Sequence, residues 1–259
     1  MALVIGVVSR GREKGKTKLI EQVTERLTRE GFRVATVKHL HGSFDTVEKD
    51  TWRHLEAGAA LTVASTPTEI ITIRRRANPA LEEALEAVYV KPDLVLVEGY
   101  KGSSIPKILC AEDASDVQAM VTKVSNIVIV SGPITEKARE MKRVKEQFPE
   151  IGIFNIERVV MALKERLVGK ILEGLPGLNC GHCGFGTCLG LAGAILRREA
   201  TTENCEVLAT TIATLKVDGK TVPLSRFPQE ALRGVVLGLL GSLKGVVEQP
   251  KNVEIQIRV

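Results

Sequence analysis

The segment Gly11-Arg12-Glu13-Lys14-Gly15-Lys16-Thr17 is the most informative part of the sequence. It follows an apolar run at 2–8 and precedes a stretch, from Leu19 to Leu27, whose apolar residues recur with helical spacing. A strand, a glycine-rich turn ending in Lys-Thr and a helix together form a phosphate-binding loop, in which backbone N–H groups and the helix N-terminus attract an anion. We therefore predict a nucleotide site made by Gly11, Lys14, Gly15, Lys16, Thr17 and Lys18, with Mg²⁺ on the Thr17 hydroxyl.

This loop departs from the standard spacing at one position. The full motif has a glycine five residues before Gly15, and this sequence has Arg10 there, with the glycine at Gly11. We therefore expect nucleotide binding with at most a slow hydrolysis.

Strands and helices alternate through the first two thirds of the chain. Helices are expected at 78–88, 136–148 and 157–167, between strands at 32–37, 61–65, 69–74, 94–98, 108–111, 126–131 and 151–154. This alternation predicts an α/β fold, a P-loop NTPase with a mostly parallel sheet. The turn Ser131-Gly132-Pro133, after one of these strands, is suited to lining a base pocket.

Two carboxylates are the candidate catalytic residues. Glu98 ends the apolar run at 94–97, so its strand would deliver it beside the loop, where it can hold Mg²⁺ through water or polarise an attacking water. Asp50, with Asp45 as a weaker candidate, follows the second strand on the side where open α/β sheets bind ligands. The alternative for Asp50 is that it caps the helix that holds Trp52 and His54.

Four of the five cysteines form a cluster with the spacing Cys-x2-Cys-x4-Cys-x16-Cys, at Cys180, Cys183, Cys188 and Cys205. Four thiolates can hold Zn²⁺ or an iron–sulfur cluster. Gly181, Gly184 and Gly186 allow turns that aim N–H groups at sulfur, and Cys188 starts a helix expected at 189–200, so an anionic cluster is favoured over zinc. Cys110 ends another apolar run and is interpreted as a buried hydrophobic residue.

Composition narrows the classes of partner. The net charge of +5 comes with only 3% aromatic residues, which leaves little surface for stacking on bases, so no nucleic-acid partner is expected. No apolar stretch approaches the length of a membrane helix, and the apolar run after Met1 lacks a basic leader. We therefore expect no membrane partner and a cytoplasmic location.

Three domains are expected: a nucleotide-binding domain at 1–169, a cluster domain at 170–210 and a small α+β segment at 211–259. The last would hold a hairpin around Asp218-Gly219, a helix at 228–243 and a strand at 253–259.

The first domain resembles the molybdopterin-guanine dinucleotide biosynthesis protein B (MobB) family. The matching blocks are Gly15-Lys16-Thr17, Val37-Lys38-His39, Lys49-Asp50-Thr51-Trp52-Arg53-His54, Val97-Glu98-Gly99-Tyr100-Lys101 and Pro106-Lys107. The resemblance implies a GTP-binding protein of the SIMIBI type, often a homodimer, that assists the guanylyltransferase attaching GMP to molybdopterin. Lys38 or Lys101 would then meet an anionic pterin or phosphate.

Residues 174–208 resemble a four-cysteine 4Fe-4S domain of corrinoid iron–sulfur proteins and of a ferredoxin-like electron-transfer subunit. Leu175-Pro176-Gly177-Leu178-Asn179-Cys180 and Thr187-Cys188 carry this resemblance, with Cys205 as the fourth ligand. The two resemblances together imply a GTP-binding accessory protein of molybdenum or tungsten cofactor biosynthesis that carries a 4Fe-4S cluster and serves a guanylyltransferase or a molybdoenzyme. The alternatives are an iron–sulfur electron-transfer protein, or a nucleotide-gated metallocluster chaperone, with a P-loop docking domain.

Overall fold

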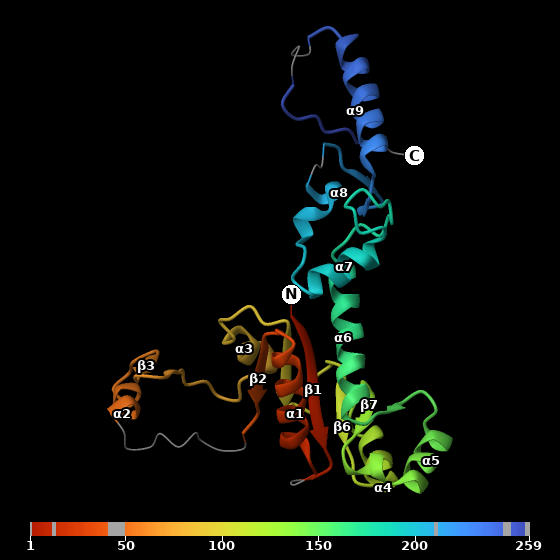
Figure 1. The fold of residues 1–259 in the computed structure, drawn as a ribbon. Helices are drawn as coiled ribbons and strands as arrows, with labels where there is room; N and C mark the ends of the chain where they lie inside the picture. Colours follow the sequence, from red (N-terminus) through yellow and green to blue (C-terminus); the bar gives the residue numbers. More distant parts are fainter. Residues whose placement is uncertain (1, 12–13, 41–49, 210–211, 246–249, 257–259) are drawn as a thin grey trace. The chain divides into compact units, whose positions relative to one another are not determined.

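The computed structural model describes residues 2–11, 14–40, 50–209, 212–245 and 250–256 (Figure 1). The chain forms two compact units, Met1–Lys164 and Glu165–Val259, and the boundary between them falls inside helix α6 (Ile156–Leu172). The finer division at residue 210 stays a prediction. Within the described ranges, no helix combines the length and the apolar character that crossing a membrane requires.

A six-stranded sheet forms the centre of the first unit, with all of its strands parallel. Its order is β2 (Val34–Lys38), β5 (Leu94–Glu98), β1 (Leu3–Ser9), β6 (Lys107–Cys110), β7 (Ile127–Ser131) and β8 (Gly152–Ile153). Strands buried on both faces carry nearly continuous apolar runs, and the first four residues of β5 are all buried. The predicted α/β fold with a mostly parallel sheet is confirmed.

Strand β1 is the point from which the chain builds the sheet in two directions. The chain passes from β1 to β2 on one side, β5 then inserts between them, and β6 follows on the other side of β1. Strands β5 and β6 therefore flank β1 directly. In the register, Val7 lies opposite Glu98 of β5 and Ser9 lies opposite Cys110 of β6. A parallel sheet binds ligands at the carboxyl ends of its strands where such a switch occurs, which is the end of β1.

The helices of this unit lie between the strands in the sequence. They are α1 (Lys16–Arg29), α2 (Asp50–Glu56), α3 (Leu81–Glu86), α4 (Ala114–Val121), the 3₁₀ turn η1 (Pro133–Glu136), α5 (Ala138–Gln147) and α6. Helix α1 buries Leu19, Ile20, Val23 and Leu27 and packs on β1, β2 and β5. Figure 1 shows α1 beside β1 and β2. The short strands β3 (Thr62–Ser65) and β4 (Ile70–Ile73) form a separate antiparallel pair. Helix α4 was not expected from the sequence.

The second unit has a small hydrophobic core of its own. Leu175, Leu191, Ala192 and Val207 form it together with Cys188 and Cys205. Its elements are α7 (Cys188–Leu196), η2 (Thr202–Asn204), α8 (Glu206–Ala209), β9 (Leu215–Val217), β10 (Lys220–Val222) and α9 (Arg226–Gly241).

The hairpin predicted around Asp218-Gly219 is confirmed, because β9 and β10 pair antiparallel. Both turn residues have positive φ, 50° and 76°, as a type I′ turn requires. The strand predicted at 253–259 is wrong for residues 253–256, which are irregular; residues 257–259 lie outside the described part. Alternating apolar residues make a strand only when a neighbouring strand supplies hydrogen bonds.

Candidate functional site

The phosphate loop joins the carboxyl end of β1 to the start of α1. Gly15 precedes the helix with φ 80° and ψ 8°, a left-handed conformation that glycine adopts without strain. The first turn of α1 contains no acidic residue, whereas Arg26 and Arg29 lie in the last turn. The helix dipole is therefore compensated at its C-terminus and open at its N-terminus, which favours binding of an anion there.

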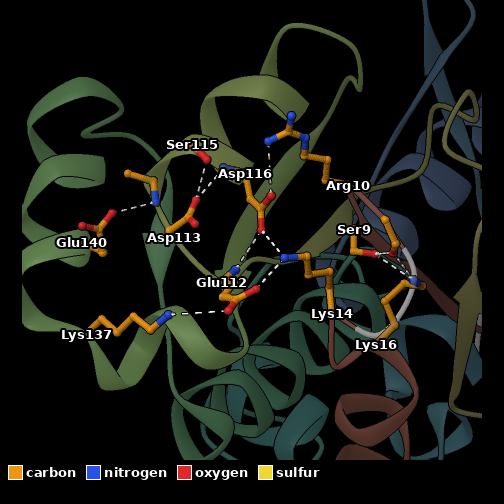
Figure 2. A network of polar contacts seen from close by, with 12 residues as sticks. Ser9, Arg10, Lys14, Lys16, Glu112, Asp113, Ser115, Asp116, Lys137 and Glu140 are labelled. Atoms are coloured by element: carbon orange, nitrogen blue, oxygen red, sulfur yellow. Dashed lines mark hydrogen bonds and ion pairs between the residues drawn. The ribbon is translucent and has the colours of Figure 1, made fainter.

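The side chain of Lys16 folds back over its own loop. Its Nζ donates to Ser9 Oγ at 2.7 Å and to the carbonyl oxygen of Gly11 at 3.1 Å, while Ser9 Oγ donates to the same carbonyl at 2.6 Å (Figure 2). Ser9 is fully buried. Ser9 was not predicted as a site residue; it is the last residue of β1 and holds the ammonium group of Lys16 at the loop.

The ends of β2 and β5 bring two distant sequence blocks together beside this loop. Lys38 and Glu98 are opposite each other in the register, and Lys38 Nζ lies 3.5 Å from Glu98 Oε2. Burial, and then the charge of Lys16, lower the pKa of Lys101. The structure therefore places Glu98 at the edge of the sheet where the loop begins.

Gly99 and Tyr100, which follow Glu98, show why the end of β5 needs a glycine. Gly99 has φ 100°, and a Cβ added there would lie 2.8 Å from His39 Cβ. The ring of Tyr100, which has φ 46°, meets the His39 ring edge to face, with centroids 4.5 Å apart. The Lys38-His39 and Glu98-Gly99-Tyr100 blocks thus pack against each other.

Asp50 is placed differently. It is the first residue of α2, its side chain is 87% exposed, and its Oδ1 lies 3.6 Å from Arg53 NH1 on the same helix. An acidic group in the first turn stabilises a helix, so the geometry favours the alternative in which Asp50 serves the helix start. Its role at a metal stays a prediction, and Asp45 lies outside the described residues.

A network of charges attaches the loop to the segment that follows β6 (Figure 2). Lys14 Nζ donates to Glu112 Oε2 at 2.5 Å, and Lys137 Nζ lies 3.9 Å from the other oxygen of Glu112. The hydrogen bond between Lys14 and Glu112 raises the pKa of Lys14 and lowers that of Glu112. Asp116 also contacts Lys14 and Arg10. Nothing in the sequence analysis assigned these acidic residues to the site.

A local signal could have revealed α4, the helix that carries Asp116. Asp113 Oδ1 accepts from the N–H of Asp116 at 3.0 Å and from the Ser115 hydroxyl at 2.7 Å, so it is the N-cap of α4. An aspartate followed three residues later by an acidic residue is a helix-start pattern. The sequence Asp113-Ala114-Ser115-Asp116 contains it.

The turn predicted to line a base pocket lies next to the loop. A Cβ added to Gly15 would be 3.8 Å from Pro133 Cδ. Gly132 has φ 92°, and a Cβ there would meet the carbonyl oxygen of Ala111 at 3.3 Å, so glycine is needed. Base recognition by this turn stays a prediction.

The predicted cysteine ligands all lie in the second unit. Cys188 and Cys205 are buried, Cys183 packs against the same core and Cys180 is exposed. Cys188 begins α7 as predicted; its N–H donates to Asn179 Oδ1 at 2.9 Å, and Thr187 caps the helix. Gly181, Gly184 and Gly186 all have positive φ.

These turns and this set of sulfur donors fit an anionic, thiolate-ligated group. Among the residues that the structure describes, no three His, Cys, Asp or Glu side chains gather as a site for one metal ion. Ligation by the four cysteines therefore stays a prediction.

Comparisons with known proteins find one matching family model in each of the two units. Residues 4–132 match the family model for molybdopterin guanine dinucleotide synthesis protein B, MobB. Residues 175–207 match a second family model, described as "Putative Fe-S cluster". The first match contains the phosphate loop and Glu98, and the second contains the four clustered cysteines.

Individual relatives point to the same family. The molybdopterin-guanine dinucleotide biosynthesis adapter protein of Haemophilus influenzae is 34% identical over 99 residues, 37% of this chain and 56% of that protein. The adapter protein of Escherichia coli is 30% identical over 110 residues, 39% of this chain and 61% of that protein. The matched segments thus span less than two thirds of either relative.

A solved structure shares the fold. The crystal structure of Bacillus subtilis MobB aligns with a TM-score of 0.50 at 22% identity, over 64% of this chain and 98% of that one.

Proposed function

We propose, because residues 4–132 match the MobB family model and residues 175–207 match the Fe-S model, that this chain is a GTP-binding accessory protein of molybdopterin guanine dinucleotide biosynthesis that carries a 4Fe-4S cluster. The observation that carries the nucleotide part is the phosphate loop at the end of β1, with the Lys16 ammonium held over it by Ser9 and Gly11. A guanylyltransferase, or a molybdoenzyme that receives the cofactor, is the partner class, and the protein acts as a homodimer.

In this proposal the described side chains divide the nucleotide between them. Lys16 leaves its contacts with Ser9 Oγ and the Gly11 carbonyl for the terminal phosphates, whose oxygens are stronger acceptors for an ammonium group. The open N-terminus of α1 supplies backbone N–H groups. Thr17 and Glu98 would hold Mg²⁺, which would neutralise phosphate charge.

Lys16→Ala tests the nucleotide site. We expect the substitution to weaken binding of Mg²⁺-GTP about ten-fold or more, because a charge-assisted hydrogen bond is worth about 1.5–3 kcal/mol. Titration calorimetry measures the change. Lys123→Ala is the matched control: Lys123 is an exposed lysine that precedes β7, so it belongs to the amino ends of the strands, whereas the loop follows the carboxyl end of β1, and its loss should leave the affinity unchanged.

Equal affinities of wild type and Lys16→Ala would reject the loop as the nucleotide site. Parallel titrations with Mg²⁺-ATP decide the base preference, and a tighter complex with ATP would contradict the GTP assignment. We expect GTP hydrolysis to be slow, because Arg10 interrupts the standard loop.

The cluster is tested by composition and colour. Anaerobically purified protein should contain iron and sulfide and absorb broadly near roughly 400 nm, as iron–sulfur proteins do. Cys188→Ser should abolish the signal, because Cys188 is buried at the N-terminus of α7. Cys110→Ser is the matched control, since that buried cysteine belongs to β6 of the other unit. Colourless protein with one stoichiometric zinc would contradict the cluster.

A further inference from the structure

Asp116 is a nearly buried carboxylate that faces the phosphate loop. Its side chain is 5% exposed, although it lies on the first turn of α4 at the ligand-binding edge of the sheet. Oδ2 accepts the N–H of Glu112 at 3.2 Å, which fixes the carboxylate against the backbone that leaves β6. Asp116 is therefore held in place by its own segment, independently of the loop.

The two oxygens of Asp116 contact two different residues of the loop (Figure 2). Oδ1 lies 3.7 Å from Arg10 NH1, and Oδ2 lies 3.6 Å from Lys14 Nζ. Arg10 immediately follows β1, and Lys14 immediately precedes Gly15 at the start of α1. One fixed carboxylate thus contacts both ends of the loop, and one of these ends is the arginine that replaces the glycine of the standard motif.

We propose that Asp116 is a positioning residue of the nucleotide site, which clamps Arg10 and Lys14 and so fixes the phosphate loop before the nucleotide arrives. The inference rests on the proposed nucleotide binding at this loop. A loop held in its binding conformation loses less conformational entropy on binding, so the clamp raises affinity without touching the ligand. The arginine at position 10 then supplies an anchor where the standard loop has a flexible glycine.

Glu112 differs from Asp116 in a way that makes the inference testable. It is 47% exposed, binds Lys14 at 2.5 Å and approaches Lys137, and none of its described ion pairs reaches Arg10. Both carboxylates place negative charge beside a site for an anionic ligand. Electrostatics by itself therefore predicts that removing either charge tightens nucleotide binding. A clamp predicts changes of Kd in opposite directions: loss of the Asp116 charge should weaken nucleotide binding, and loss of the Glu112 charge should tighten it.

Asp116→Asn and Glu112→Gln, each removing one charge with little change of shape, should be titrated with Mg²⁺-GTP in the full chain. We expect Asp116→Asn to raise Kd roughly two- to five-fold, because the loop ends lose the two ion pairs to their common anchor. Glu112→Gln should lower Kd by about two-fold, because Lys14 loses a competing carboxylate. Tighter binding by Asp116→Asn would overturn the clamp and leave repulsion as its effect.

A double-mutant cycle separates a clamp from a general structural role. In an Arg10→Gln, Lys14→Gln background, Asp116→Asn should change Kd by less than about two-fold, because the groups that it held are gone. An undiminished effect there, with a matching loss of thermal stability, would overturn the inference. If wild type and Lys16→Ala bound Mg²⁺-GTP equally, the proposed function and the clamp would both be rejected. Lys16-dependent binding that Asp116→Asn leaves intact would reject the clamp only.

Discussion

Lys107, the first residue of β6, shows how a charged side chain can serve the fold. It is fully buried, and its Nζ donates to the carbonyl oxygens of Ser103 at 2.5 Å, Ile105 at 2.9 Å and Ser125 at 3.1 Å. An ammonium group has three donors, so all of them are satisfied by backbone. Burial lowers the pKa of Lys107 because the charged form loses its hydration. Lys107, which belongs to one of the blocks that resemble the MobB family, is thus a structural residue. It lies at the amino end of β6, whereas the loop follows the carboxyl end of β1.

Replacing Lys107 by methionine should destabilise the first unit by about 2–4 kcal/mol, because buried carbonyl groups are left without donors. Urea unfolding monitored by circular dichroism measures the loss. Lys123→Met, at an exposed position of the same unit, should change stability by less than about 0.5 kcal/mol. Equal midpoints for the two variants would show that the three hydrogen bonds of Lys107 contribute nothing net.

Among the secondary-structure elements, α4 is the one that presents Asp116 to the phosphate loop. The N-cap Asp113 sets where this helix begins. The Ser115 hydroxyl, and then the N–H of Asp116, lower the pKa of Asp113 below its ordinary value of 3.8. An acid whose pKa is depressed on folding stabilises the folded state above its unfolded pKa, and this contribution is lost as the pH falls through the folded pKa.

Asp113→Ala should cost about 1 kcal/mol at pH 7, the usual value of an N-cap. Asp113→Asn is the matched control, because asparagine caps equally well and does not titrate. The stability difference between wild type and Asp113→Asn should therefore change only below about pH 4, where the wild type loses its charge. Denaturant midpoints at pH 7 and pH 3 measure both effects. A wild-type and alanine pair that differ equally at both pH values would contradict a charged cap.

At the scale of the whole molecule, each of the two units buries apolar side chains of its own among the residues that the structure describes. The first unit packs Val8, Leu109 and Val130 with residues from α4 and α5. The second packs Leu175 and Leu191 around Cys188 and Cys205. A core that includes two predicted cluster ligands should depend on that cluster for its stability, because metal binding and folding are linked in small domains.

We therefore expect two thermal transitions, each shifted by one ligand. Mg²⁺-GTP at about 100 times its Kd should stabilise the first unit by about 2.7 kcal/mol, and removal of the cluster should lower the other transition. Differential scanning calorimetry separates the two, with Lys16→Ala as the variant in which the GTP shift disappears. One transition that responds to both ligands together would show that the units unfold as one.

The sequence by itself determined the features that depend on short-range pattern. Strand, turn and helix around Gly15-Lys16-Thr17 follow from apolar runs and from spacing. An acid directly after an apolar run also located Glu98 at the carboxyl end of its strand, the end at which the loop begins. The hairpin at Asp218-Gly219 follows from turn chemistry. The same kind of pattern failed at 253–256, because alternation does not show whether a partner strand is present.

Tertiary structure decided which charges meet at the loop. Arg10 and Lys14 are about a hundred residues from Glu112 and Asp116 in the sequence, and they become neighbours because β6 pairs with β1 so that Ser9 lies opposite Cys110. Electrostatic contact depends on distance in space, which no local spacing encodes. The arginine that breaks the standard motif gains a partner only when the sheet has formed.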